Sequence, residues 1–333
     1  MAKPLWMVRA GRGGVYADDF IGNGYVGIGW RNAGDPTAVT NKAVLVERFA
    51  KAWPESSEQS RLVGASIVYR FVREISIGDD VITYDPATRT YRMGAITGPA
   101  QWTGDDDDFR NTVRTVTWQA SVLRDGLSDA TRNSLGSTLT LFLVPAVAAT
   151  ELRNVAAAPA PTDAEPVIVP PLAIDIDPFA DLADTARERI KDRIARLDWE
   201  QMQALVAALL RAMGYRTSVS SRGPDRGRDI LATPDGFGFR APRIIVEVKH
   251  RPGQTMGAPE VRALPVGRQA DDRGLFVSTG GFTREAYYEA EHGKVPISLV
   301  NLDDLTREII HNYANFDDEG RALLPLQRLY WPL

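Results

Sequence analysis

The sequence contains no cysteine among its 333 residues. Disulfide bonds, cysteine-ligated zinc and thiol catalysis are therefore excluded. No run of residues approaches the roughly 18 apolar positions that a membrane-spanning helix needs, and the N-terminal residues do not have the pattern of a signal peptide. We therefore expect a cytoplasmic protein that makes no use of a membrane.

The chain also lacks a nucleotide-binding P-loop. Its glycine-rich stretch, residues 10–14, does not end in Gly-Lys-Ser or Gly-Lys-Thr, and no other stretch does. We expect no NTP-driven motor in this chain.

An excess of positive charge is missing overall, since the formal net charge is −4. Residues 211–284 differ from this average, because they hold 13 Lys or Arg against 7 Asp or Glu. A local basic surface of this kind is typical of phosphate binding. A solvated face that happens to be basic is the alternative interpretation.

The length and an ordinary composition, 44% hydrophobic and 25% charged, indicate two globular domains. Residues 146–177 are rich in Ala and Pro and are predicted to be a linker. Before it, residues 1–145 alternate short strands and glycine-rich turns, with helices at 42–53 and 58–73. This pattern predicts a small, mostly antiparallel β-barrel with a few helices.

After the linker, residues 178–333 alternate helices and strands. Asp198 and Gln201 form a capping-box signature before an apolar helical face, and Gly214 ends that helix. The alternation predicts a mixed sheet flanked by helices, so we expect an α/β (α+β) protein with two dissimilar domains.

One predicted strand carries an unusual pair of charges. Branched apolar residues at 244–246 and 248 are interrupted by Glu247 and Lys249, which point to the same side of a strand. Asp229 lies at the start of the preceding strand. Two carboxylates from adjacent strands are typical ligands of Mg²⁺, and a lysine beside them is suited to orient or deprotonate the attacking water. As a bare pattern this spacing is weak, but its place in an apolar strand favours a phosphodiesterase site.

The segments around this pair resemble the catalytic domain of the Mrr family of restriction endonucleases. The resemblance runs in order through Trp199-Glu200, residues 213–215, 223–230, Glu247-Val248-Lys249-His250, 260–262 and 278–286. It implies the PD-(D/E)xK nuclease fold and a dependence on Mg²⁺, with Mn²⁺ as a substitute. It also implies double-stranded DNA, often modified, as the substrate. Carried over, Asp229 and Glu247 are metal ligands and Lys249 is the catalytic lysine.

Four further residues are weaker candidates. Glu200 resembles a family position that assists the metal, although an acid in the first turn of a helix is equally explained by the helix dipole. Arg226 and Arg228 replace part of the usual glycine-rich turn and are candidates for phosphate contact. Gln269 is a candidate for contact with DNA. Solvent exposure explains the two arginines equally well.

The first domain contains the aromatic residues Trp30, Tyr69, Tyr84, Trp102 and Trp118, and a turn at residues 77–81 leads into one of its strands. In these features the domain distantly resembles EVE and PUA-like barrels, which implies a reader of modified bases. Stacking of a flipped base between aromatic rings is the mechanism that such a reader needs. The candidate pocket residues are Trp30, Tyr69, Tyr84, Trp102, Trp118 and Asp79. For any single aromatic residue, packing in the barrel core is the better interpretation.

Together these features predict a Mg²⁺-dependent, modification-dependent DNA restriction endonuclease with an N-terminal reader and a C-terminal nuclease. Cleavage of both strands requires two active sites, so a homodimer or a DNA-bridged pair is expected. Two alternatives stay open: a nucleic-acid-binding adaptor whose nuclease fold is inactive, and a nuclease of repair or RNA processing.

Overall fold

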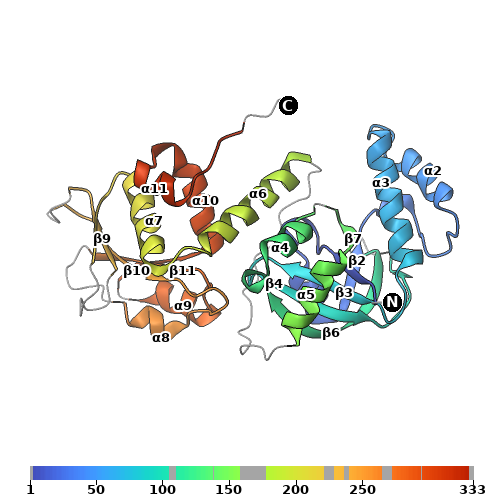
Figure 1. Cartoon of the computed structure of the whole chain (residues 1–333), viewed down its shortest axis with the longest axis horizontal. Helices are drawn as coiled ribbons and strands as arrows, with labels where there is room; N and C mark the ends of the chain where they lie inside the picture. Colours follow the sequence, from blue (N-terminus) through green and yellow to red (C-terminus); the bar gives the residue numbers. More distant parts are fainter. Residues whose placement is uncertain are drawn as a thin grey trace. The chain divides into compact units, whose positions relative to one another are not determined.

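The computed structural model describes residues 3–104, 110–137, 139–157, 178–220, 229–235, 240–264, 272–293 and 295–329. The chain forms two compact units, which among the described residues hold 3–157 and 178–182 in unit 1 and 183–329 in unit 2 (Figure 1). None of the described helices is both long enough and apolar enough to cross a membrane.

Unit 1 is built on a curled sheet of seven strands. Its path runs β2 (Tyr25–Ile28), β6 (Thr112–Leu123), β4 (Thr90–Ile96), β3 (Asp80–Asp85), β1 (Leu5–Val8) and β7 (Leu141–Leu143), while β5 (Gln101–Trp102) pairs with β6. Only β1 and β3 are parallel to each other. The end strands β2 and β7 are not hydrogen-bonded to each other in the described part of the chain. The predicted mostly antiparallel strands are confirmed, but closure into a barrel is not.

Five helices accompany this sheet in the described residues. They are α1 (Ala17–Asn23), α2 (Lys42–Ala52), α3 (Glu58–Tyr69), α4 (Asp129–Leu135) and α5 (Ala146–Ala156). The predicted helices at 42–53 and 58–73 are confirmed, and the second continues as a π-helical turn through Arg70–Glu74. Two apolar cores result, one around Phe20 and Phe71 and the other around Tyr91 and Leu152.

The predicted linker begins too early. Residues 146–156 form helix α5, and its Ala148, Ala149 and Leu152 are buried in the second core of unit 1. Alanine is the strongest helix former, and the spacing of these three residues gives the helix an apolar face. This part of the Ala-rich stretch therefore belongs to unit 1, and residues 158–177 lie outside the described chain.

Unit 2 holds a mixed five-stranded sheet in the order β12 (Ile297–Asn301), β11 (Asp272–Ser278), β10 (Arg243–Lys249), β9 (Ile230–Thr233) and β8 (Arg216–Val219). Strands β10, β11 and β12 are parallel, whereas β9 and β8 continue the sheet in antiparallel pairs. The predicted mixed sheet flanked by helices is confirmed.

Helices cover both faces of this sheet (Figure 1). On one face lie α6 (Pro178–Ile194), α7 (Trp199–Ala212), α10 (Leu302–Asn312) and α11 (Asp318–Leu323), and on the other α8 (Ala258–Arg262) and α9 (Arg284–His292). The predicted cap of α7 is present. The Asp198 side chain accepts a hydrogen bond from the Gln201 backbone N–H, and the Gln201 side chain accepts one from the Asp198 backbone N–H. Capping and burial of its apolar stripe fix α7 against the sheet.

Candidate functional site

Strand β10 divides its side chains between the two faces of the sheet. Val246 and Val248 are buried in the core beneath α7. Glu247 and Lys249 are paired in register with Phe276 and Ser278 of β11, and Phe276 lies in the core beneath α8 and α9. Neighbouring strands in register point side chains to the same face. The predicted placement of Glu247 and Lys249 on one side of the strand is therefore confirmed.

Asp229 lies beside this pair, immediately before β9. Its backbone N–H donates to Val246 O at 2.9 Å, and its carboxylate Oδ2 accepts from the Val248 backbone N–H at 2.7 Å. The side chain is thus fixed between β9 and β10 by contacts to the strand that carries Glu247 and Lys249.

Glu247 is only partly satisfied. Its Oε1 accepts from Lys249 Nζ at 2.5 Å, with side-chain exposures of 13% for Glu247 and 32% for Lys249. Its second oxygen, Oε2, is buried and has no hydrogen-bond partner among the described residues. A buried acceptor without a partner is costly, and such atoms are uncommon in folded proteins.

The two carboxyl groups oppose each other electrostatically. Burial raises the pKa of Asp229, while the Val248 N–H, Lys249 and Gln203 act to lower it. Burial also raises the pKa of Glu247; Lys249 acts to lower it and Asp229 to raise it. A cation between the two carboxylates would relieve this opposition, since charged groups in a partly buried site need a counter-charge.

The ligand chemistry of this pair fits a hard divalent ion. No group of three or more His, Cys, Asp or Glu side chains suited to a metal occurs among the described residues. Mg²⁺ is commonly held by one or two carboxylates and completes its coordination with water and phosphate oxygens. Asp229 and Glu247, with the open Oε2, are consistent with that mode of binding.

Glu200 does not form a metal-binding group with Asp229 and Glu247 in the described structure. It lies exposed in the first turn of α7. One turn later, Gln203 faces the site from the buried side of the same helix, with 2% exposure. Its amide acts on the Asp229 carboxyl, although its Nε2 does not reach the geometry of an ordinary hydrogen bond.

Sequence reasoning missed Gln203. The available signal was a polar residue at the edge of an apolar helical face, three residues before Val206 and seven before Leu210. Such a residue must find a polar partner when it is buried, and the carboxylate of Asp229 is the one that it approaches.

The end of β11 adds two hydroxyl groups to the surroundings of the site. Ser278 and Thr279 are 0% and 5% exposed, and neither hydroxyl oxygen has a partner in the described structure. The loops after β10 and β11 meet here at Gly280, where a Cβ atom would lie 2.0 Å from Gln254 O. Glycine is required at this position because the two backbones approach so closely.

Three sequence candidates cannot be placed. Arg226, Arg228 and Gln269 lie outside the described residues.

In unit 1 the aromatic residues predicted for the reader are divided between two cores and strand β5. Trp30, Tyr69 and Trp118 pack against the core around Phe71, while Tyr84 packs against the core around Tyr91. Trp102 lies on β5. Asp79 is 9% exposed, and its Oδ2 accepts from Trp6 Nε1 at 3.1 Å and from the Ser76 backbone N–H at 2.9 Å. The carboxylate of Asp79 is therefore hydrogen-bonded within unit 1.

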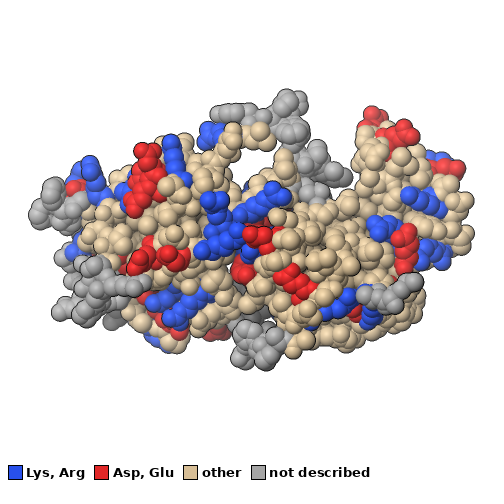
Figure 2. Space-filling view, in the orientation of Figure 1, with Lys and Arg blue, Asp and Glu red and all other residues tan. Residues whose placement is uncertain are grey.

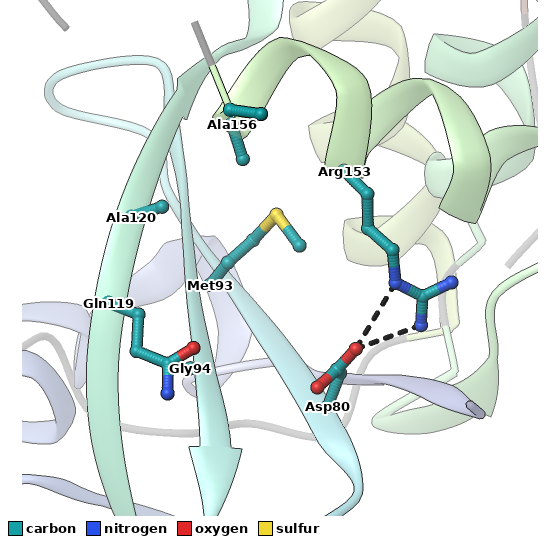
Figure 3. A pocket seen from close by; sticks show the side chains of 8 residues that line it. Asp80, Met93, Gly94, Gln119, Ala120, Arg153 and Ala156 are labelled. Carbon is teal, nitrogen blue, oxygen red and sulfur yellow. Dashed lines mark hydrogen bonds and ion pairs between the residues drawn. The ribbon is translucent and has the colours of Figure 1, made fainter. Parts of the chain in front are cut away.

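A different hollow exists in unit 1, between α5 and strands β4 and β6 (Figure 3). Its volume is about 220 Å³, and Met93, Ala120 and Ala156 form part of its lining. The ion pair between Arg153 and Asp80, at 2.9 Å, lies at one side. None of the six predicted reader residues lines this pocket.

Comparisons with known proteins assign a family to unit 2. Residues 194–309 match the family described as restriction endonuclease, over the segment where the sequence resembles the Mrr catalytic domain. The chain therefore carries a restriction endonuclease domain, and the predicted resemblance is confirmed. Residues 6–141 match a family described only as a domain of unknown function. The resemblance of unit 1 to EVE and PUA-like domains stays a prediction.

Individual relatives add little to this assignment. The uncharacterized protein y4cE of Sinorhizobium fredii (strain NBRC 101917 / NGR234) is 30% identical over 99 residues, which are 29% of this chain and 25% of that protein. The chain thus matches only a quarter of that relative's length.

Two solved structures show weak likeness over longer spans. The DNA modification-dependent restriction endonuclease AspBHI has a TM-score of 0.33 and 18% identity, covering 80% of this chain and 73% of AspBHI. The MspJI restriction endonuclease, in complex with a 27-mer oligonucleotide, has a TM-score of 0.31 and 13% identity, covering 87% and 69%. At these TM-scores the likenesses carry no argument.

Proposed function

We propose that this protein is a Mg²⁺-dependent endonuclease that hydrolyses phosphodiester bonds of modified double-stranded DNA. The observation that supports this most directly is the group at the end of β10. Asp229 and Glu247 come from adjacent strands, Lys249 touches Glu247, and Glu247 Oε2 is left open in a restriction endonuclease domain.

In this proposal Asp229 and Glu247 hold the ion. Bound Mg²⁺ supplies charge neutralisation at the phosphate and lowers the pKa of water. The Val248 N–H keeps the Asp229 carboxylate oriented, and the Gln203 amide lies behind it. Lys249, one-third exposed, is placed to hold the attacking water at the open side of the pair.

Unit 1 is the proposed reader of the modification. A separate compact unit that precedes a nuclease domain is suited to select the DNA on which the nuclease acts. We assign this role to unit 1 as a whole, with the unclosed sheet and its partly buried aromatic residues as the surface to test. Cleavage of both strands would then require two copies of unit 2, as a homodimer or as a pair joined by DNA.

The test is cleavage of methylated and unmethylated plasmid in the presence of Mg²⁺. The expected result is cleavage of the methylated plasmid by the wild-type protein and by Lys51→Ala, an exposed control on α2. Lys249→Ala should leave the plasmid intact. Intact DNA in every lane would contradict the enzyme assignment, and equal cleavage of both plasmids would contradict the reader assignment.

A further inference from the structure

Helix α6 lies almost entirely before residues 194–309, the segment that matches the nuclease family. Its charged side chains differ from one side of the helix to the other. Arg189, Arg193 and Arg196 are all exposed. Their spacing of four and then three residues places them on one side of the helical path, which continues through hydrogen bonds to Leu197. A group of Lys and Arg side chains gathers over α6 in Figure 2.

An adjacent side of α6 is apolar and buried, and the buried Lys191 is neutralised by ion pairs. Ile190, Ile194 and Leu197 pack with α7 and α10. Lys191, 3% exposed, is paired with Glu188 at 2.8 Å and with Asp303 of α10. Asp192 is 7% exposed. The exposed side of this stretch therefore carries Arg189, Arg193 and Arg196, with the largely buried Asp192 at its margin.

Arg189 and Arg193, the first two arginines of the stripe, are not fixed by ion pairs to described residues of the protein. Neither Arg189 nor Arg193 makes an ion pair with any residue that the structure describes, whereas Arg187 on the same helix is paired with Asp184 at 2.7 Å. Long side chains without a partner are free to meet a ligand of opposite charge.

Two connections place helix α6, which carries this stripe, near the edge of the sheet that holds the candidate active site. The parallel strands β10, β11 and β12 end in register at Lys249, Ser278 and Asn301. Asn301 caps α10, and Asp303 in the first turn of α10 binds Lys191. Since adjacent strands are about 4.8 Å apart, Lys249 and Asn301 lie roughly 10 Å apart along this edge.

The second connection runs through the chain itself. Arg196 lies three residues before Trp199, where α7 begins, and Gln203 in the second turn of α7 faces Asp229. The contact of Lys191 with α10 therefore holds α6 near this edge, and the link to α7 brings the Arg196 end of the stripe toward it.

We propose that Arg189, Arg193 and Arg196 form a docking surface for the phosphate backbone of the duplex whose scissile bond lies at Asp229, Glu247 and Lys249. The stripe spans about 10 Å at the rise of an α-helix, a length over which one DNA strand carries about three phosphates. Guanidinium groups bind phosphate oxygens in bidentate geometry. This inference rests on the proposed function, because it takes duplex DNA as the substrate.

The test uses the full chain with Lys249→Ala, without Mg²⁺, and a fluorescent 30-base-pair duplex in a methylated and an unmodified form. The dissociation constant is measured by anisotropy at several KCl concentrations from 50 to 200 mM. Adding R189Q, R193Q and R196Q together should weaken binding at least about tenfold at 50 mM. Each lost phosphate contact lowers the slope of log K against log salt by about 0.9, so the slope should fall by about 2 to 3.

A matched control removes the same charge elsewhere on unit 2. Arg262, Arg307 and Arg321 are exposed and are engaged with Glu289, Asp304 and Ala314 O. R262Q, R307Q and R321Q together should change the slope by less than one. The single variant R193Q, with an expected slope change of about 0.9, tests the same surface if the triple variant does not fold.

The outcomes separate the two claims. A stripe variant that folds and binds like the control overturns the docking surface alone. A Lys249→Ala parent that binds neither duplex overturns the proposed function and the docking surface together. In the active background, the stripe variant should raise KM about tenfold with kcat unchanged, and a loss confined to kcat would also contradict a docking role.

Discussion

Asp79 in unit 1 and Glu247 in unit 2 are both acidic residues at or beside a central strand, but they are held in opposite ways. The Asp79 carboxylate accepts from the Trp6 indole and the Ser76 backbone within unit 1. Glu247 has one oxygen on Lys249 and one without a partner in the described structure. A carboxylate whose acceptors are filled by the protein stabilises the fold, whereas one left open is available to a ligand.

The largest expected difference between the two acids is in catalysis. Lys249→Ala and Asp229→Asn should each lower kcat at least about 10³-fold, because removal of a group that acts on the reacting centre removes several kcal/mol of transition-state stabilisation. Asp79→Asn should leave the rate per folded molecule unchanged. Single-turnover cleavage measurements at saturating Mg²⁺ check this, and a rate loss for Asp79→Asn would break the comparison.

The next effect is on stability and has the reverse pattern. Asp79→Asn should lower the free energy of unfolding of unit 1 by about 1 to 3 kcal/mol, because the Trp6 and Ser76 N–H groups both donate to the charged Oδ2, and the amide oxygen that replaces it carries no formal charge. Glu247→Gln, which keeps an oxygen for Lys249, should not lower the stability of unit 2. Urea unfolding followed by tryptophan fluorescence measures both, and an equal loss in the two variants would contradict the distinction.

A smaller effect of opposite sign is expected at Glu247. Burial raises the pKa of its carboxyl, so the contribution of this group to stability is fully present below its unfolded pKa, where the carboxyl is protonated, and is lost as the pH rises through its folded pKa. Glu247→Gln should therefore raise Tm by about 2 °C in the absence of divalent ions. The rise in Tm on adding Mg²⁺ to the wild-type protein should disappear in this variant. A Glu247→Gln protein that is still stabilised by Mg²⁺ would remove Glu247 from the ligand set.

The smallest effect is expected at Asp317, a carboxylate of unit 2 that the protein satisfies as it does Asp79. A hydrogen bond from Arg211 lowers the pKa of Asp317, so its stability contribution is present above its unfolded pKa and is lost as the pH falls. Because the pair is partly exposed, Asp317→Asn should cost less than about 1 kcal/mol at pH 7 and less at pH 3 than at pH 7. Urea unfolding at both values checks this. A pH-independent cost would show that the helix cap, which accepts from the Gly320 N–H, is the cause instead.

Local patterns predicted the elements of unit 2 because one physical signal dominated each of them. The charged pair in an apolar strand indicated β10, and the capping pair Asp198 and Gln201 indicated the start of α7. The adjacency of Asp229 to Glu247 followed from the order of two consecutive strands joined by a short connection.

What the sequence did not predict depends on contacts between elements. Gln203 reads as one more polar residue of a helix until α7 is packed on the sheet and its amide faces Asp229. The aromatic residues of unit 1 looked like one group, but the fold divides them between two cores. Helix α5 was assigned to a linker because composition outweighed the spacing of its three buried residues.

The register of β10, β11 and β12 couples correct folding of unit 2 to the formation of the candidate site. Side chains alternate along a strand, so a slip of β10 by one residue would send Glu247 and Lys249 into the apolar layer under α7 and expose Val246 and Val248 in their place. Such a chain would lose its core together with its site. Mispaired molecules of unit 2 should therefore be removed as unfolded protein and should not persist as a folded form that binds DNA without cutting it.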